Sequence, residues 1–183
     1  MFGFIVARTP GEQSQMNTYA TSKLAAWNFC TMFARNQHWP ITGAMIYQCY
    51  GRGQSNRSLV SAAIEKARAQ QDFPMTEGKQ EKDWIHVSDV VAGLETAISA
   101  EQLPPAHTLH FGTGRSTSVA KVVQKAYEIA KSTGKPLIGR LPSRPGETAV
   151  QKAPIAEETA PYLPTWKPKF DLDSGLQELI TGR

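Results

Sequence analysis

The stretch QEKDWIHVSDVVAGLETAI, residues 80–98, decides the fold class because a strand-like run leads directly into a helix. Residues 83–87 (DWIHV) form a short, largely apolar run that is typical of a strand. Ser88 can cap the helix that follows, and Asp89 in its first turn suits the helix dipole. We therefore expect a strand at 83–87 followed by a helix that ends at Ser99.

The same alternation continues on both sides of this stretch. Upstream, the pattern predicts a helix at 19–37, a strand at 41–47, a helix at 57–71 and a turn-rich segment at 72–82. Downstream, it predicts strands at 108–111 and 136–141, helices at 118–133 and 172–180, and a winding surface segment at 142–168. Strands that alternate with helices favour an α/β fold with parallel strands.

Length and composition indicate one globular domain or a domain and a half. The chain has 183 residues, 40% hydrophobic and 20% charged, which excludes intrinsic disorder, collagen-like sequence and a coiled coil. We find neither a signal-peptide pattern nor an apolar run long enough to span a membrane. Cys30 and Cys49 lie in apolar surroundings without metal-ligand spacing. We therefore expect a cytoplasmic protein with reduced cysteines, no metal site and no membrane contact.

The charge balance is mildly basic, with 20 Lys and Arg against 16 Asp and Glu. A dedicated nucleic-acid binder usually has clustered Lys and Arg, so we expect no nucleic-acid partner. Between Glu12 and Glu65 there is no acidic residue, while four basic residues fall inside that window. The window can face an anion, or it can be a helix and a strand that are mostly buried, and both interpretations stay open.

Tyr19 and Lys23 are the first candidates for chemistry. In the expected helix they are four residues apart and share one face. An ammonium beside a phenol stabilises the phenolate, which makes a general acid/base for a hydroxyl or carbonyl group. The spacing alone is weak evidence, because Tyr127 and Lys131 repeat it on what is more simply a solvated helix face. Apolar residues cover more than one stripe of the helix at 19–37, so we expect it to be buried on several sides.

Two further segments are candidates for anion binding. Gly112-Thr-Gly114 follows an expected strand and opens an expected helix, which is the context of a dinucleotide-binding turn. Its third glycine is absent, and no acidic residue follows at the usual distance, so we expect a structural turn whose amides could still meet an anion. Arg140 and Arg144 in a proline-framed loop suit a phosphate, although a solubilising loop is the simpler interpretation.

Six segments, in order, resemble the second half of an extended short-chain dehydrogenase/reductase of the NAD-dependent sugar-nucleotide epimerase/dehydratase family. They are TYATSKLAAW (18–27), ITGAMIYQCYGRGQ (41–54), QEKDWIHVSDVVAGLETAI (80–98), LHFGTGRSTSVAKVV (109–123), LPSRPGE (141–147) and WKPKFDLDSGLQELI (166–180). The resemblance implies an incomplete Rossmann-type parallel sheet with flanking helices plus a small α/β substrate-binding lobe. Residues 1–56 would be the remnant of the Rossmann half, and 57–183 the lobe, interleaved with returning Rossmann strands and helices.

The resemblance also implies roles for individual residues. Tyr19 would be the catalytic acid/base toward a sugar hydroxyl, and Lys23 would assist it, with both also contacting the cofactor, NAD or NADP. The substrate would be a nucleotide sugar, whose diphosphate Lys82 and Arg144 would bind. Gln48 stands where the family usually has an asparagine that contacts the substrate.

The family's glycine-rich turn, its ribose-binding acidic residue and its catalytic Ser or Thr have no counterpart in the eighteen residues before Tyr19. We therefore expect little or no NAD-dependent activity from the isolated chain. A partner chain would supply the Rossmann half, or the sequence is a truncated reading of a longer gene, and a homodimer is a further possibility. One alternative is a module that binds a nucleotide sugar without redox chemistry. Another is a truncated, non-functional remnant whose helix at 19–37 exposes apolar area and drives self-association.

Overall fold

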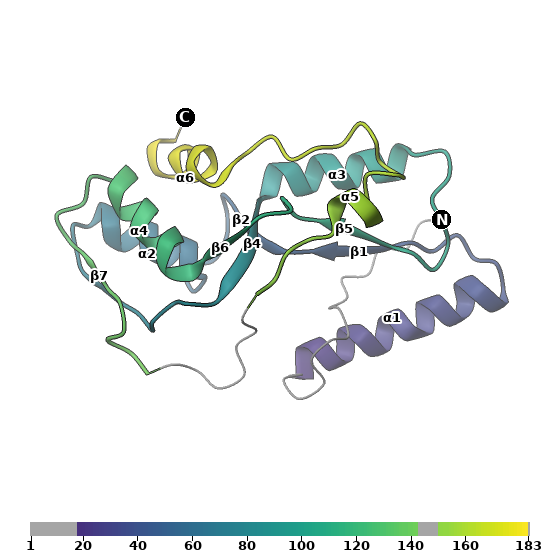
Figure 1. The fold of residues 1–183 in the computed structure, drawn as a ribbon, viewed down its shortest axis with the longest axis horizontal. Coiled ribbons are helices and arrows are strands. Elements are labelled where there is room, and N and C mark those ends of the chain that lie inside the picture. The colour runs from purple at the N-terminus through teal and green to yellow at the C-terminus, as the bar shows by residue number, and fades with distance from the viewer. Residues whose placement is uncertain (1–17, 143–149, 183) are drawn as a thin grey trace.

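In the computed structural model, residues 18–142 and 150–182 are described. The helices are α1 (Thr18–Asn36), α2 (Leu59–Arg68), α3 (Val87–Ser99), α4 (Val119–Ile129), α5 (Ile155–Glu158) and α6 (Leu172–Thr181). The strands are β1 (Gly43–Ile46), β2 (Gln48–Tyr50), β3 (Phe73–Pro74), β4 (Glu81–His86), β5 (Thr108–Phe111), β6 (Ser116–Ser118) and β7 (Pro136–Leu137). Figure 1 shows how these elements follow one another, and the expected α/β class with parallel strands is confirmed.

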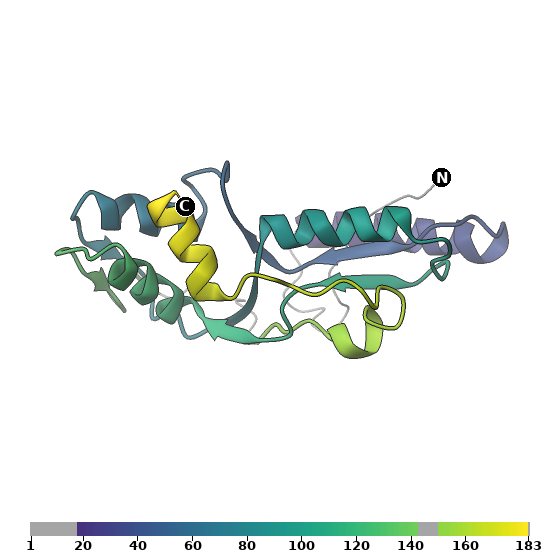
Figure 2. The ribbon, with the colours of Figure 1, turned by 90° about the horizontal axis from the view of Figure 1, so that it is seen from above.

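The strands form three short sheets. β1 pairs with β5 in parallel, from Gly43 opposite Thr108 to Ile46 opposite Phe111. β2 runs parallel to β4, and β6 pairs with the other edge of β4 in the antiparallel sense. β3 and β7 form a parallel pair at the end of the molecule where α2, α4 and α6 gather, while α1 and α3 lie at the other end (Figures 1 and 2).

Strand β4 joins two hydrophobic clusters. Successive residues of a strand point to opposite faces. Trp84 accordingly belongs to the cluster that contains Val122 of α4 and Leu176 of α6, whereas Ile85 packs in the cluster with Leu109 of β5. β4 therefore contributes side chains to both clusters, as does β2, whose Tyr50 lies in the first cluster and whose Cys49 packs against the second.

Helix α1 covers the range expected from sequence, but the expectation that it is buried on several sides is wrong. Only Ala20 and Ala34 are buried, and Phe29 is 63% exposed. The helix lies against β1 along one face, where a Cβ on Gly43 would come within 2.8 Å of the Trp27 ring. Only one face of the helix packs against β1. The apolar side chains on its other faces are therefore not covered by any of the residues that the structure describes.

Several local boundaries also differ from expectation. The strand expected at 41–47 is interrupted at Tyr47, whose N–H still donates to Phe111 O of β5 before the chain turns to pair with β4. The helices expected at 57–71 and 118–133 are shorter, and the strand at 136–141 is reduced to β7. The N-cap of α3 is His86 rather than Ser88, because the imidazole of His86 accepts the hydrogen bond from Ser88 N.

Candidate functional site

A cavity of about 370 Å³ opens beside β2 and β4. Polar and basic side chains enter it from these strands and the segment before β4, and apolar side chains form the remaining walls. Its lining consists of Gln48, Leu59, Phe73, Pro74, Met75, Thr76, Gln80, Lys82, Trp84, Val119 and Leu141. This mixture of apolar walls with a few convergent polar groups is typical of small-molecule sites.

The strand register explains why two of the residues singled out from sequence meet in this cavity. Gln48 of β2 lies directly opposite Trp84 of β4. Lys82 is two positions before Trp84, so its side chain emerges on the same face of β4. Gln48 and Lys82 therefore line one cavity although the chain between them passes through α2 and β3. Arg144, the third predicted substrate-binding residue, lies outside the described residues.

Trp84 forms a fixed wall of the cavity. Its indole Nε1–H donates to Thr117 O over 2.9 Å, which ties the ring to β6. The ring is 6% exposed and is supported from behind by the hydrophobic cluster. An immobile aromatic wall beside the ammonium of Lys82 suits a ligand that combines a flat ring with an anionic group.

The Gly112-Thr-Gly114 turn does meet an anion, but the anion belongs to the chain itself. The amides of Thr113 and Gly114 donate to the two carboxylate oxygens of Asp83 over 2.7 and 2.8 Å. The Thr113 hydroxyl and the Ala153 amide donate to the same carboxylate, at 2.7 and 3.0 Å. Asp83 is completely buried, so these donors are used for structure. The turn does not fit a dinucleotide pyrophosphate.

Tyr19 and Lys23 lie together, but away from the cavity lining. Both extend from the first two turns of α1, and Lys23 Nζ lies over the Tyr19 ring, 5.6 Å from its centroid. Tyr19 is 61% exposed. The shared helix face expected from their spacing is present. The structure therefore forms two groupings of predicted site residues, the Tyr19–Lys23 pair and the Gln48–Lys82 cavity.

The sequence did not reveal Asp83 as an organising residue, and it indicated only that His86 is a core histidine. Both are buried within β4. The available signal was a carboxylate and an imidazole inside the apolar run DWIHV, since buried polar groups need partners. Only the fold identifies those partners, which come from segments far along the chain.

Two other observations bear on the site. Among residues 18–142 and 150–182, no group of three or more His, Cys, Asp or Glu side chains is placed to hold a metal ion. In the same part of the chain, no helix has both the length and the apolar character needed to cross a membrane.

Comparison with known proteins bears on the family and the fold of the chain. Residues 6–112 match the model of the NAD dependent epimerase/dehydratase family. The dTDP-glucose 4,6-dehydratase of Xanthomonas campestris pv. campestris is 23% identical over 174 residues, a match that covers 88% of this chain and 48% of that enzyme. The chain thus spans about half the length of that curated relative.

Solved structures resemble the chain over most of its length. The UDP-glucuronic acid 4-epimerase of Bacillus cereus, in complex with UDP-glucuronic acid and NAD, gives a TM-score of 0.82 at 19% identity and covers 99% of this chain and 61% of its own. The UDP-glucose 4-epimerase of Thermotoga maritima, with UDP-glucose, gives 0.79 at 22% identity and covers 89% of this chain and 52% of its own. This likeness shows a Rossmann-like arrangement of strands and helices.

Proposed function

The chain belongs to the NAD dependent epimerase/dehydratase family, and on this premise we propose that it binds a nucleotide sugar and contributes the proton-transfer pair of a nicotinamide-dependent reaction. The observation that carries the proposal is the cavity in which Gln48 and Lys82 meet beside Trp84. In this proposal the Lys82 ammonium binds the diphosphate, and the Gln48 amide hydrogen-bonds the substrate. Arg144, which the family resemblance also assigns to the diphosphate, completes the proposed set.

Tyr19 is the proposed acid/base. A bound NAD or NADP would supply hydride transfer at a sugar carbon. The phenolate of Tyr19 would accept the proton of the hydroxyl on that carbon as a carbonyl forms, and the phenol would return the proton in the reverse direction. Lys23, whose ammonium lies 5.6 Å from the ring centroid, is the proposed partner of Tyr19 in this step.

The described residues fit only part of a dinucleotide. Tyr19 and Lys23 are on an accessible face of α1 and suit contact with the nicotinamide ribose. The amides of Thr113 and Gly114 do not suit the pyrophosphate, because Asp83 already accepts their hydrogen bonds. We therefore propose that a further unit with the Rossmann half, in the same polypeptide or in a partner chain, completes the cofactor site. Its proposed contact is the exposed apolar side of α1, which includes Phe29 and Met32.

The proposal predicts binding without turnover for the 183-residue chain alone. Isothermal titration with UDP-glucose, UDP-glucuronic acid and dTDP-glucose should give heat with at least one of them, and Lys82→Ala should weaken it. Lys79→Ala is the matched control, because Lys79 is an exposed lysine paired with Glu77 and does not line the cavity. No heat with any of the three would contradict nucleotide-sugar binding. Turnover by the isolated chain with NAD, abolished by Tyr19→Phe, would contradict the proposed dependence on a further unit.

A binding module without redox chemistry is the second candidate function. It is favoured by one observation, namely that the Tyr19–Lys23 pair does not line the cavity of Gln48 and Lys82. The two candidates differ when the partner unit is supplied, since only the enzyme would then change nicotinamide absorbance.

We also propose a cytoplasmic location, which the two free thiols of Cys30 and Cys49 support.

A further inference from the structure

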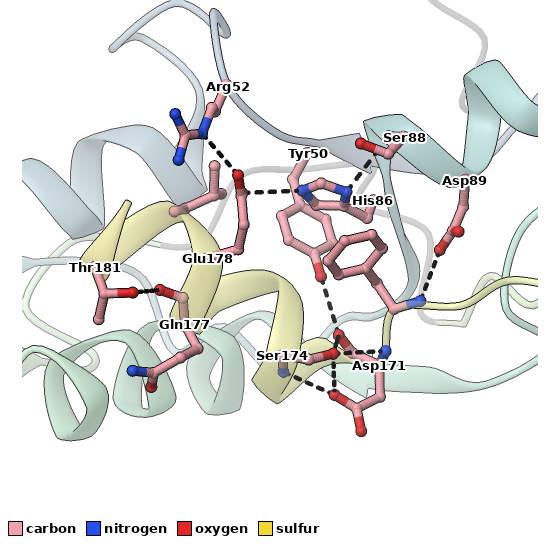
Figure 3. A network of polar contacts seen from close by, with 12 residues as sticks. Tyr50, Arg52, His86, Ser88, Asp89, Asp171, Ser174, Gln177, Glu178 and Thr181 are labelled. Carbon is pink, nitrogen blue, oxygen red and sulfur yellow. Dashed lines mark hydrogen bonds and ion pairs between the residues drawn. The ribbon is translucent and has the colours of Figure 1, made fainter. Parts of the chain in front are cut away.

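The β2–β4 layer that borders the cavity ends in a buried imidazole with partners on two different helices. His86 is 3% exposed and lies at the end of β4. Its Nδ1 accepts a hydrogen bond from Ser88 N at the start of α3, over 3.4 Å. Its Nε2 faces Oε2 of Glu178 on α6, also over 3.4 Å (Figure 3). One ring therefore touches the beginning of one helix and the last turns of another.

These contacts define where the proton of the neutral ring lies. A nitrogen that accepts a hydrogen bond carries no proton, so Nδ1 is the unprotonated nitrogen. The proton is then on Nε2, the ring nitrogen that lies 3.4 Å from Oε2 of Glu178. Nε2 and Glu178 Oε2 lie 3.4 Å apart, and in the part of the chain that is described neither atom makes a hydrogen bond.

A second proton can only be added at Nδ1. Nδ1–H would then face Ser88 N–H, and two donors cannot bond to each other, so the cap of α3 would be lost. The same proton would give the ring a positive charge opposite Glu178, which strengthens that contact. We propose that His86 is a proton-operated toggle: the neutral imidazole caps α3, whereas the imidazolium releases α3 and forms a buried ion pair that anchors α6.

The surroundings of His86 favour such a toggle. The ring is held between Tyr50, with 5.5 Å between ring centroids, and Phe170, with 4.2 Å. Arg52 Nε lies 2.7 Å from Glu178 Oε1, which holds the Glu178 carboxylate in place. The imidazole is therefore fixed in place, and a change in its protonation alters its hydrogen bonds without requiring it to move.

Other charged and titratable groups lie on the elements that pack around the ring. They are Tyr50 and Arg52 in and after β2, Asp89 in α3, Lys169 before α6, and Asp171 and Glu178 on α6. Burial raises the pKa of Tyr50, and the Ser174 amide lowers the pKa of Asp171. Asp89 accepts hydrogen bonds from the amides of Lys169 and Phe170. Histidine is the side chain whose charge ordinarily changes between about pH 5 and pH 8.

The packing of α6 against β2 also involves residues next to the cavity wall. A Cβ at Gly175 would come within 2.1 Å of the Tyr50 hydroxyl, so α6 and β2 are in close contact. Tyr50 and Leu176 belong to the same hydrophobic cluster as Trp84, which lines the cavity. The toggle does not depend on the proposed function, because it concerns only contacts within the chain.

Amide hydrogen exchange and imidazole ¹⁵N NMR on the full chain, at about pH 7.5 and pH 5.5, test the toggle. On acidification, and after correction for the intrinsic pH dependence of exchange, we expect protection of the Ser88 amide to fall about fivefold, the loss typical of an N-cap. Protection of the α6 amides should rise over the same range. The ¹⁵N shift of His86 Nδ1 should change from the unprotonated to the protonated value.

Variants test separately the two effects of protonating His86, namely the loss of the α3 cap and the ion pair with α6. Glu178→Gln, which keeps the shape of the side chain, should abolish the response of α6 and leave that of Ser88. His38→Gln is the control, because His38 is an exposed histidine after α1 and both responses should persist. The inference is overturned if His86 becomes protonated while Ser88 keeps its protection, or if α6 loses protection on acidification. It is equally overturned if His86 remains neutral at about pH 5.5.

Discussion

The ammonium of Lys23 lies over the ring of Tyr19, 5.6 Å from its centroid, on an exposed face of α1. The two side chains need no tertiary contact to meet, because residues four apart on a helix are neighbours. The pair is thus preformed and accessible, while the cavity of Gln48 and Lys82 is built separately between β2 and β4. A ligand that used both would have to extend from one grouping to the other.

Replacing Tyr19 by phenylalanine tests the acid/base role. Because Tyr19 is 61% exposed, we expect the unfolding free energy of Tyr19→Phe to stay within about 0.5 kcal/mol of wild type. Turnover measured with the completing unit present should fall about a hundredfold or more, as for loss of a general acid/base. Thermal unfolding and nicotinamide absorbance are the measurements. Undiminished turnover in the folded variant would exclude Tyr19 as the proton-transfer group.

Changing the charge of Lys82 tests the substrate cavity. Lys82→Ala should weaken nucleotide-sugar binding by about tenfold to a hundredfold, since a hydrogen bond to a charged group contributes about 1.5–3 kcal/mol. Lys82→Arg should retain affinity, because a guanidinium binds phosphate in a bidentate way. Calorimetry at two salt concentrations measures both variants beside Lys79→Ala. Equal affinities for all three would show that Lys82 does not contact the ligand.

Removing the charge of Asp83 tests the buried carboxylate that holds the Gly112–Gly114 turn. In Asp83→Asn, one of the donors from Thr113, Gly114 and Ala153 would face an NH₂ group instead of an oxygen. We expect a loss of about 2 kcal/mol or more in unfolding free energy, as for a buried donor left unpaired. Denaturant unfolding gives the value. The exposed control Asp173→Asn should change it by less than about 1 kcal/mol, and equal effects would contradict a special role of Asp83.

The N-cap of α6 predicts a pH dependence of stability. The backbone N–H of Ser174 donates to Asp171 and lowers the pKa of that carboxyl. A carboxyl with a lower pKa in the folded state adds stability above its unfolded value, about 3.9, and this is lost as pH falls through the folded value. The difference in unfolding free energy between wild type and Asp171→Asn should therefore shrink from about pH 5 to pH 3. A difference that stays constant over this range would contradict the cap.

The exposed apolar side of α1 predicts association. If a second copy or a partner covers this surface, Phe29→Glu should disrupt the complex, since Phe29 is 63% exposed in the chain alone. Sedimentation velocity over a range of concentrations, with and without the partner, measures the effect. Val91→Glu on α3 is the control, because Val91 is exposed on a different helix. Equal disruption by both variants, or association that neither affects, would place the contact elsewhere.

Local sequence patterns predicted much of the secondary structure. Residues 108–111 form the expected strand, and α1 and the terminal helix α6 each lie within one residue of their expected bounds. These elements depend on periodicity and capping within a few residues, which a single sequence displays directly. The split at Tyr47 and the shortening to Pro136–Leu137 depend on which strands are available to pair, and this is not a local property.

The amino-acid sequence alone was sufficient for the α/β class, the family and the shared helix face of Tyr19 and Lys23, because each rests on short-range spacing or on motifs in a characteristic order. Tertiary structure decided that Gln48 and Lys82 share a cavity, that Asp83 takes up the amides of the Gly112–Gly114 turn, and that His86 lies between α3 and α6. These relationships arise from strand register and from buried polar groups that must find partners. Except for Ser88, which is two residues from His86, the partners are dozens of residues away along the chain, where no local pattern can identify them.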